Sequence, residues 1–390
     1  MQNSRKKEQH IAVFGESGSG KTVLVSSFYG AAREQLGKEN LFTVVADNNP
    51  QGRFLYQTFL GMKGDSVLPL ATRFDSESYS FSVNVKDSAN SKSEKTRPFD
   101  AVRLVWHDYP GEWFEQDVSG PEAERRVATF KNLLRSNVAL ILVDGQRLLD
   151  NAGEEERYLK ALLTNFANGL LLMKDLLLED GKPLIQFPRI WIFALSKCDL
   201  LPDLDVFALR DLLIGKASKE MDQLEEVIAG FIEEPEALSV GEDFVLLSSA
   251  KFEPEKIDVT QRVGLNLILP IATMLPLERH ARWLAGMQSR GKVYKHFIDG
   301  AISMAAALGG LGALAVKLDK SDNKILKYLG LALIHFGSAI EEVAKLVGDK
   351  LLNANEDAVA KEENLRATLT GFRMDLANGE AEKIFIRSDR

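Results

Sequence analysis

The sequence predicts an α/β fold: a mostly parallel sheet covered by helices on both faces, in three layers, followed by a C-terminal all-α helical region. Three observations lead to this class. Short apolar runs alternate with longer helical patterns from Ile11 to about Lys251, as expected for a parallel sheet. Several runs are apolar throughout, which is typical of strands buried on both faces. From Leu265 onward the composition is helical.

Seven strands and three clear helices are expected in the first part of the chain. A polar segment, KDSANSKSEKTRP, joins the third and fourth strands and predicts an antiparallel hairpin. The interval from Lys38 to Thr72 is expected to contain an added strand and helix. The strands are 11–14, 41–46, 79–85, 102–106, 138–143, 190–195 and 244–247, and the helices are 22–36, 154–178 and 207–231.

The 390 residues exceed the length of about 250 to 300 at which single cores usually stop growing, so at least two domains are expected. A boundary within 252–275 gives domains at 1–265 and 266–390. The net charge of −8 argues against nucleic acid as the main partner, because phosphate binding needs a surplus of Lys and Arg.

The single cysteine, Cys198, excludes an internal disulfide and suits a reducing compartment. The basic N-terminus, MQNSRKKEQH, has no apolar core after it and does not have the pattern of a secretory signal. We therefore expect a cytoplasmic protein.

The segment GESGSGKT lies between the first strand and the first helix and fits G-x-x-x-x-G-K-[ST] in the context that this motif requires. In such a loop the main-chain amides and the helix N-terminus face the phosphates. Lys21 then reaches the β and γ oxygens, and Thr22 offers its hydroxyl to Mg²⁺. The nucleotide-binding residues expected here are Gly15, Ser17, Gly18, Ser19, Gly20, Lys21 and Thr22.

A second motif, D-x-x-G, occurs in VRLVWHDYPGEWF at the end of the fourth strand. Asp108 can hold Mg²⁺ through water, because this cation keeps most of its hydration shell. The N–H of Gly111 can approach a γ-phosphate without a Cβ in the way, so the segment after it can be tethered in one nucleotide state and released in the other. Trp113 and Phe114 follow, as hydrophobic anchors of this segment or as a partner surface.

Two later strand ends carry the residues expected to recognise the base, in SKCD at 196–199 and SSAK at 248–251. The Asp199 carboxylate can accept both the N1–H and the 2-amino group of guanine, two donors that adenine does not present together. The stem of Lys197 would pack across the phosphate loop and the base plane, and the Ala250 amide would donate to the guanine O6. Base-binding residues are thus Lys197, Asp199, Ser249, Ala250 and Lys251.

The four segments GESGSGKT, DYPG, SKCD and SSAK, in this order and each at a strand end, resemble the nucleotide boxes of translation-factor-related (TRAFAC) Ras-like GTPases. The resemblance covers residues 11 to about 251. It implies a three-layer P-loop NTPase sheet of Ras-like type, GTP or GDP with Mg²⁺, and slow hydrolysis used as a switch. The string DYPGEW also resembles YcjX-type bacterial P-loop GTPases and the GTPase modules of bacterial conflict systems.

Two positions depart from the family pattern. Ser196 stands where Asn or Thr is usual, which predicts a looser tie to the phosphate loop. Glu112 stands where Ras-like enzymes carry Gln, and a γ-phosphate repels a carboxylate. Hydrolysis then depends on another group or stays slow until a partner or second protomer assists.

The threonine that completes the magnesium shell is expected between the first helix and the strand at 79–85. Thr72 is the choice, with Arg73 as a charge-stabilising neighbour, and an ordinary loop threonine is the alternative. The expected metal ligands are Thr22, Thr72 and Asp108, and the expected catalytic residues are Lys21, Thr72, Gly111 and Glu112.

The helical region contains an uncharged run of 17 residues at 300–316 and a second apolar run of 13 residues at 328–340. A spanning helix needs about 20 apolar residues. Apolar residues from Leu326 to Leu351 recur in steps of three and four, which predicts an apolar helical hairpin at about 297–352 packed on the first domain or on a second protomer. A membrane or partner helix is the alternative, and flanking lysines would then contact an anionic inner leaflet.

These patterns lead to a GTP-dependent switch that couples nucleotide state to the packing or exposure of the helical region. Two alternatives stay open, a nucleotide-holding interaction module with negligible hydrolysis and a membrane-acting GTPase effector. The expected partners are a guanine nucleotide and either an unknown protein or a second copy of the chain, bound through the switch regions or the helical region.

Overall fold

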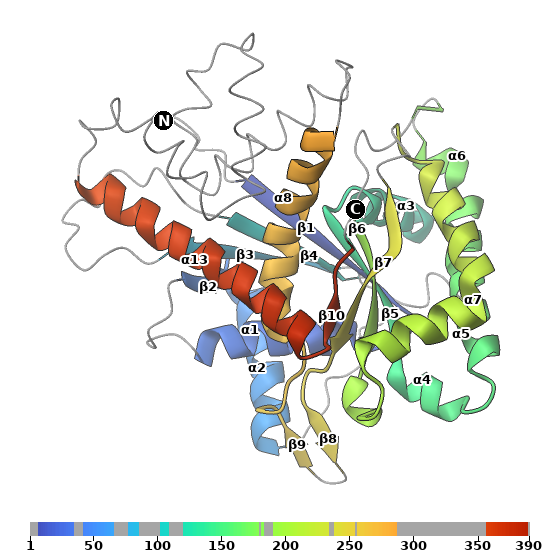
Figure 1. The fold of residues 1–390 in the computed structure, drawn as a ribbon, viewed down its shortest axis with the longest axis horizontal. Helices are drawn as coiled ribbons and strands as arrows, with labels where there is room; N and C mark the ends of the chain where they lie inside the picture. The colour runs from blue at the N-terminus through green and yellow to red at the C-terminus, as the bar shows by residue number, and fades with distance from the viewer. Residues whose placement is uncertain are drawn as a thin grey trace.

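In a computed structural model of the chain, the residues described are 7–34, 42–65, 77–85, 102–108, 120–178, 181–182, 190–233, 238–253, 256–286 and 356–388. They form an eight-stranded sheet with helices on both of its faces (Figure 1). The strand order is β10-β7-β6-β5-β1-β4-β3-β2. The predicted three-layer α/β class with a helical C-terminal region is confirmed.

All seven predicted strands are present. The central strands β4, β1, β5, β6 and β7 run parallel, whereas β2, β3 and β10 are antiparallel to their neighbours. The strands of the sheet are β1 (Lys7–Phe14), β2 (Phe42–Ala46), β3 (Glu77–Val85), β4 (Val102–Asp108), β5 (Val138–Asp144), β6 (Ile190–Ser196), β7 (Ser239–Leu247) and β10 (Phe385–Ile386).

The helices include the three predicted ones, which appear as α1, as α5 with the short α6, and as α7. The added strand and helix expected after the first helix are β2 and α2. The helical elements are α1 (Lys21–Glu34), α2 (Asn49–Asp65), α3 (Pro121–Leu134), α4 (Gly145–Asp150), α5 (Glu155–Leu172), α6 (Lys174–Leu177), α7 (Val206–Ala229), α8 (Ile268–Gly286), α13 (Glu356–Ala381) and the short 3₁₀ turns η2 (Cys198–Leu200) and η4 (Leu265–Leu267).

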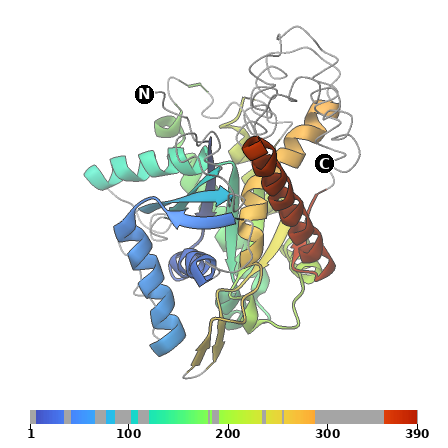
Figure 2. The ribbon, with the colours of Figure 1, turned by 90° about the vertical axis from the view of Figure 1, so that its left-hand side faces the viewer.

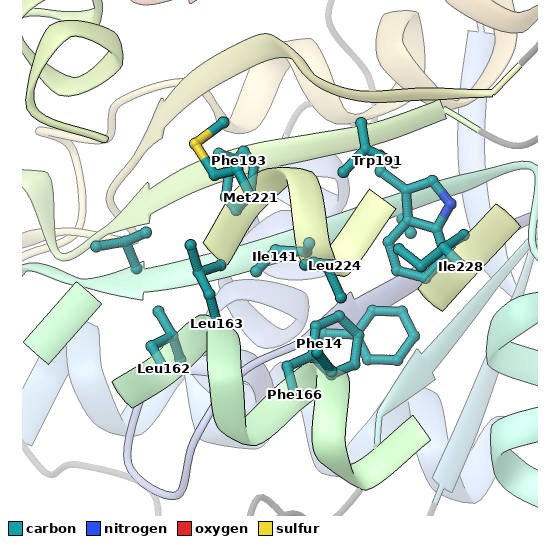
Figure 3. Packing of buried hydrophobic residues seen from close by; sticks show 14 of the residues in the cluster. Phe14, Ile141, Leu162, Leu163, Phe166, Trp191, Phe193, Met221, Leu224 and Ile228 are labelled. Atoms are coloured by element: carbon teal, nitrogen blue, oxygen red, sulfur yellow. The ribbon is translucent and has the colours of Figure 1, made fainter. Parts of the chain in front are cut away.

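The parallel strands are apolar throughout because both of their faces are buried. Along β1, Ile11 and Val13 point to a core shared with α1, α8 and α13, whereas Ala12 and Phe14 point to a core shared with α3, α5 and α7. The ring centroids of Phe14 and Phe166 lie 4.7 Å apart in the second core (Figure 3). Residues 11–14 of β1 therefore pack alternately against the two helical layers.

Strands β3 and β4 form the predicted antiparallel hairpin. Apolar and polar residues alternate along β3: Tyr79, Phe81 and Val83 are buried in the core with α1, whereas Ser78 on the other face is exposed. This alternation is typical of an antiparallel strand with one face in the core. Strand β2 pairs with β3 and lies at one end of the sheet.

The C-terminal region packs directly on the sheet. Helix α13 lies beside α8 in both ribbon views (Figure 2), and the two helices contact each other. Leu369, Phe372 and Leu376 of α13 are buried in the same core as Ile11 of β1. The described residues of 266–390 thus share a core with the sheet. The domain division at residue 265 and the hairpin at 297–352 stay predictions, because residues 287–355 lie outside the described residues.

Three short strands were not predicted. Strand β10 departs from an all-helical C-terminal region and pairs with β7, whose outer edge would otherwise be open. Strands β8 (Lys251–Glu253) and β9 (Lys256–Asp258) form a hairpin beyond the sheet, at the bottom of both ribbon views. Within the described part of the chain, no helix combines the length and apolar character that a membrane span requires.

A buried ion pair joins α8 to β7 and to the C-terminal segment. Both oxygens of Asp243 accept from Nη2 of Arg279, at 2.6 and 2.8 Å, and Oδ1 also accepts from the Ser388 amide at 2.9 Å. Burial raises the pKa of the Asp243 carboxyl, and the charge of Arg279 opposes that rise. The pair compensates for burying an acid that is fully shielded from solvent.

Replacing Arg279 by Met is expected to lower the free energy of unfolding by about 3 to 5 kcal/mol, because it leaves the Asp243 charge buried without its partner. Chemical denaturation measures the change. Arg210→Met is the matched control, because Arg210 pairs with Asp211 on the surface and its loss is expected to cost at most about 0.5 kcal/mol. Equal changes in the two variants would contradict the role given to the buried pair.

Candidate nucleotide-binding site

The predicted motifs meet at one edge of the sheet. Strands β1, β4, β6 and β7 are parallel, so their carboxyl ends lie on the same side. The phosphate loop follows β1, Asp108 ends β4, and the SKCD and SSAK segments begin at or just after the ends of β6 and β7. In open α/β sheets this edge is where ligands bind.

The phosphate loop turns through two glycines with positive φ, Gly18 at 78° and Gly20 at 89°. Residues that carry a side chain rarely adopt this conformation, so the loop requires glycine at both positions. A Cβ on Gly15 would lie 2.5 Å from Oγ of Ser19 and 3.1 Å from Cβ of Leu142, so this glycine allows the loop to pack tightly on β5. Ser17 is half-buried in the same turn. The loop thus has the glycines that a main-chain phosphate cradle needs.

Lys21 begins α1, and its side chain folds back over the loop. Its Nζ donates to the carbonyl oxygens of Gly15 at 2.8 Å and Glu16 at 3.0 Å. The residue is 7% exposed. A buried ammonium that donates to neutral carbonyls gains strongly from an anionic oxygen, because desolvation of the cation is then balanced by an opposite charge.

Thr22 and Asp108 meet although 86 residues separate them. Oγ1 of Thr22 donates to Oδ2 of Asp108 at 2.7 Å, and Asp108 is 4% exposed. A hydroxyl and a carboxylate are hard oxygen donors and fit Mg²⁺, which takes few protein ligands and keeps several waters. These two residues would hold the ion. Thr72, Gly111 and Glu112 lie outside the described residues, and their roles stay predictions.

A cavity of about 250 Å³ opens next to the loop. Lys197, with φ at 53°, lies in its wall, and its Nζ donates to Oδ2 of Asp144 at 2.8 Å. The described residues that line the cavity are Ser19, Gly20, Val23, Leu24, Gln146, Ser196, Lys197, Leu200, Ser248, Ser249 and Phe252. The phosphate loop and both predicted base-recognition segments therefore contribute to one cavity.

Asp199 is half-buried and contacts two of the lining residues. Its Oδ1 is 2.6 Å from Oγ of Ser248, and its Oδ2 accepts from the Phe252 amide at 3.1 Å. Both partners line the cavity, whereas Asp199 itself does not. A carboxylate has about four lone-pair sites, so these contacts leave acceptor capacity on both oxygens. Recognition of guanine by Asp199 stays a prediction.

The SSAK segment contributes unevenly to the cavity. Ser249 lines it and is 4% exposed. Ala250 is fully buried in a small core with Phe59 and Ile257, and the predicted contact of its amide with a base stays a prediction. Lys251 is exposed and pairs with Glu253 at 2.9 Å, so the structure does not bring its ammonium to the cavity.

The turn from β5 into α4 contacts both the phosphate loop and the SKCD segment, and these contacts were not predicted from the sequence. Asp144 binds Lys197 as described, and Arg147 pairs with Glu16 of the phosphate loop at 3.1 Å. A Cβ on Gly145 would lie 2.7 Å from the Lys197 carbonyl oxygen, so only glycine allows this approach. The Ser196 hydroxyl donates to Val143 at 3.3 Å. The sequence signal for this turn is the pair Asp144-Gly145 at the end of an apolar run.

Two titratable groups near the site are in their neutral forms at neutral pH. Burial and the charge of Asp199 raise the pKa of the Cys198 thiol to about 12. Burial lowers the pKa of His107, beside Asp108, to about 4. His107 lies one residue before the end of β4 and contacts His10 at 2.9 Å and Ser78 at 2.9 Å.

Comparisons with known proteins find little beyond this geometry. No protein-family profile and no curated protein matches the chain. Among solved structures, a single-residue variant of Aquifex aeolicus Era bound to GDP·AlF4⁻ is 15% identical over 73% of this chain and 69% of that one, with a TM-score of 0.23. A bacterial dynamin, from an oligomerised pair described as sensing and tethering membranes, is 14% identical over 98% of this chain, with a TM-score of 0.26. This chain covers 61% of that dynamin's length.

At these values neither similarity carries an argument. The assignment of the fold rests on the chain itself, on the parallel strands β4, β1, β5, β6 and β7 and on the glycine loop between β1 and α1. Together these features define the α/β fold of a P-loop NTPase.

In the folded protein, Cys198 is expected to react with a thiol reagent far more slowly than a free thiol does, because it is 6% exposed and its raised pKa leaves almost no thiolate. Release of the chromophore from Ellman's reagent measures the reaction. Denaturant is the control: the chain has one cysteine, so unfolding must release one equivalent. Full reaction of the native protein at the rate of the unfolded chain would contradict the burial described.

Proposed function

We propose that the protein binds GTP and GDP with Mg²⁺ and hydrolyses GTP slowly, as a nucleotide-dependent switch. The observation that carries the proposal is the contact of Thr22 with Asp108 at 2.7 Å, beside the glycine loop and Lys21. Two sequence motifs that are distant along the chain meet where a phosphate-bound Mg²⁺ would require them.

The phosphate end of the nucleotide is held by the loop. The amides of the glycine-rich turn and the N-terminus of α1 supply donors and a positive helix end. Lys21 exchanges the carbonyls of Gly15 and Glu16 for the β and γ oxygens, which converts neutral hydrogen bonds into charge-assisted ones. Mg²⁺, held by Thr22 and Asp108, would neutralise charge on the phosphates.

Guanine is the base that the site supports best. The remaining lone pairs of Asp199 match the N1–H and 2-amino donors of guanine, and adenine would leave this charge without two partners. Ser248 and the Phe252 amide hold the carboxylate in place. Asp144 fixes the ammonium of Lys197, so the lysine stem is held at the wall of the cavity.

Hydrolysis and switching are assigned to segments outside the described residues. Gly111 and Thr72 would contact the γ-phosphate and the Mg²⁺, and these contacts would order two loops in the GTP state. Glu112 is a poor residue for orienting water because phosphate repels its charge. Slow turnover, accelerated by a partner or a second protomer, follows from this.

The switch would act on the C-terminal helical region. Support comes from η4, which contacts α1 of the phosphate loop as well as α8 and α13. A conformational change at the N-terminus of α1 would therefore reach α8 and α13 through η4, which contacts all three helices. A cytoplasmic location, with peripheral contact at the inner membrane through the hairpin at 297–352, is part of the same proposal.

Asp199→Ala is expected to weaken GTP binding on the order of 100-fold and to abolish the preference for GTP over ATP, because the variant loses the bidentate acceptor. Titration calorimetry with both nucleotides measures this. Asp203→Ala, in an exposed position of the following loop, is the matched control and is expected to bind like the wild type. Wild-type protein that binds ATP as tightly as GTP would contradict the assignment of guanine as the preferred base.

With protein in excess over GTP, phosphate release is expected in a single turnover, and it is expected to disappear with a chelator and in Asp108→Asn. Asparagine keeps an acceptor for Thr22 but loses the charge that holds Mg²⁺. A phosphate-sensor assay measures release, and Asp211→Asn, on the exposed surface of α7, is the control. Tight GTP binding without any release would instead favour the nucleotide-holding module.

A further inference from the structure

The cavity beside the phosphate loop has one aromatic side chain among the described residues that line it, Phe252. This residue belongs to the β8–β9 hairpin, outside the motifs found in the sequence. Its neighbours in the lining include the aliphatic side chains of Val23, Leu24 and Leu200. A polar loop thus leads into a cavity with an apolar wall, and such a wall suits a flat aromatic ligand group.

The backbone of Phe252 is hydrogen-bonded to the SKCD segment. Its amide donates to Oδ2 of Asp199 at 3.1 Å, so the backbone of β8 is tied to the carboxylate proposed to read the base. Ser248, whose hydroxyl lies 2.6 Å from the other oxygen of Asp199, lines the same cavity. A shift of Phe252 would move a partner of Asp199 as well.

The side chain of Phe252 packs against a small hydrophobic core. This core consists of Phe59 and Met62 from α2 together with Ala250, Ile257 and Val259. Pairing of Phe252 with Ile257 across the hairpin fixes which face of β8 meets this core. The hairpin and α2 therefore form a support, and the half-buried ring keeps one part available to the cavity.

We propose that Phe252 is the aromatic contact of the purine base and that α2 with the β8–β9 hairpin forms the base-side wall of the site. This inference rests on the proposed nucleotide binding and adds a residue and a structural unit to it. Stacking on an aromatic ring is available to every base, because every base has a π-face. Phe252 thus contributes affinity, and the choice of guanine stays with Asp199.

Phe252→Trp provides a direct readout. The indole is expected to lie against the base, so GDP should change its fluorescence, whereas pyrophosphate, which fills the phosphate loop without a base, should leave it unchanged. The wild type supplies the background of its four tryptophans. Phe207→Trp is the matched control, because Phe207 is 40% exposed on α7 and does not line the cavity.

Phe252→Ala is expected to weaken GDP and ADP binding by the same factor, about 10- to 100-fold, and to leave the ratio of the two affinities unchanged. Phe252→Leu keeps the apolar bulk that packs on the small core and should lose affinity while staying as stable as the wild type. Calorimetry gives the affinities, and thermal unfolding without nucleotide gives the stability. Loss of affinity without loss of stability identifies contact with the ligand.

The outcomes separate this inference from the proposed function. The inference is overturned, and the proposed function stands, if the wild type binds GDP but both expected effects are absent. In that case GDP leaves the fluorescence of Phe252→Trp unchanged, and Phe252→Leu binds GDP with wild-type affinity. A changed preference for guanine in Phe252→Leu would also overturn it, since the ring would then be selecting the base. If the wild type binds neither GDP nor ADP, the proposed function fails and the inference falls with it.

Discussion

The parallel pairing of β1 with β4 on one side and β5 on the other is the constraint on which the site depends. In this register Ala12 lies beside His107 and Phe14 beside Ile141. The end of β1 therefore emerges between Asp108 and the turn at 144–147. The contact of Thr22 with Asp108 comes from the end of β4, and that of Glu16 with Arg147 comes from the turn after β5. A slip of β1 by one residue would also exchange its two buried faces.

The β5–α4 turn supplies contacts between loops that Ser196, which stands where the GTPases that the sequence resembles carry Asn or Thr, does not make. A serine side chain is too short to bridge two loops, and Ser196 binds within its own strand pair. Two ion pairs from the turn reach outward instead, through Asp144 to Lys197 and through Arg147 to Glu16. Both loops are thus bound to the same turn.

Much of this architecture could be predicted from the sequence. Buried strands such as β5 and β6 are apolar along nearly their whole length, and the GESGSGKT loop identifies itself by its glycines and its context. Strands β8 and β9 could not be found, because three residues with charged ends, KFE and KID, carry no period. Strand β10 could not be predicted because a run of two residues has no pattern that identifies the strand with which it pairs.

The site was predictable to the same degree, and for the same reason. Lys21, Thr22 and Asp108 could be picked out from motifs, because the residue pattern around each is recognisable before the fold is known. The contacts of Asp199 with Ser248 and of Arg147 with Glu16 depend on which loops the sheet brings together. Phe252 belongs to this second group, because its spacing resembles that of any aromatic residue near a strand end.

The pairing of β10 with β7 has a consequence for how the chain folds. Phe385 pairs with Val245, and 140 positions separate them, so this contact closes a very large loop. Closing such loops is entropically unfavourable and slows folding, whereas local helices form early. We therefore expect the outer edge of β7 to stay unpaired until late in folding, and unpaired strand edges are sites of proteolysis and of pairing with other chains.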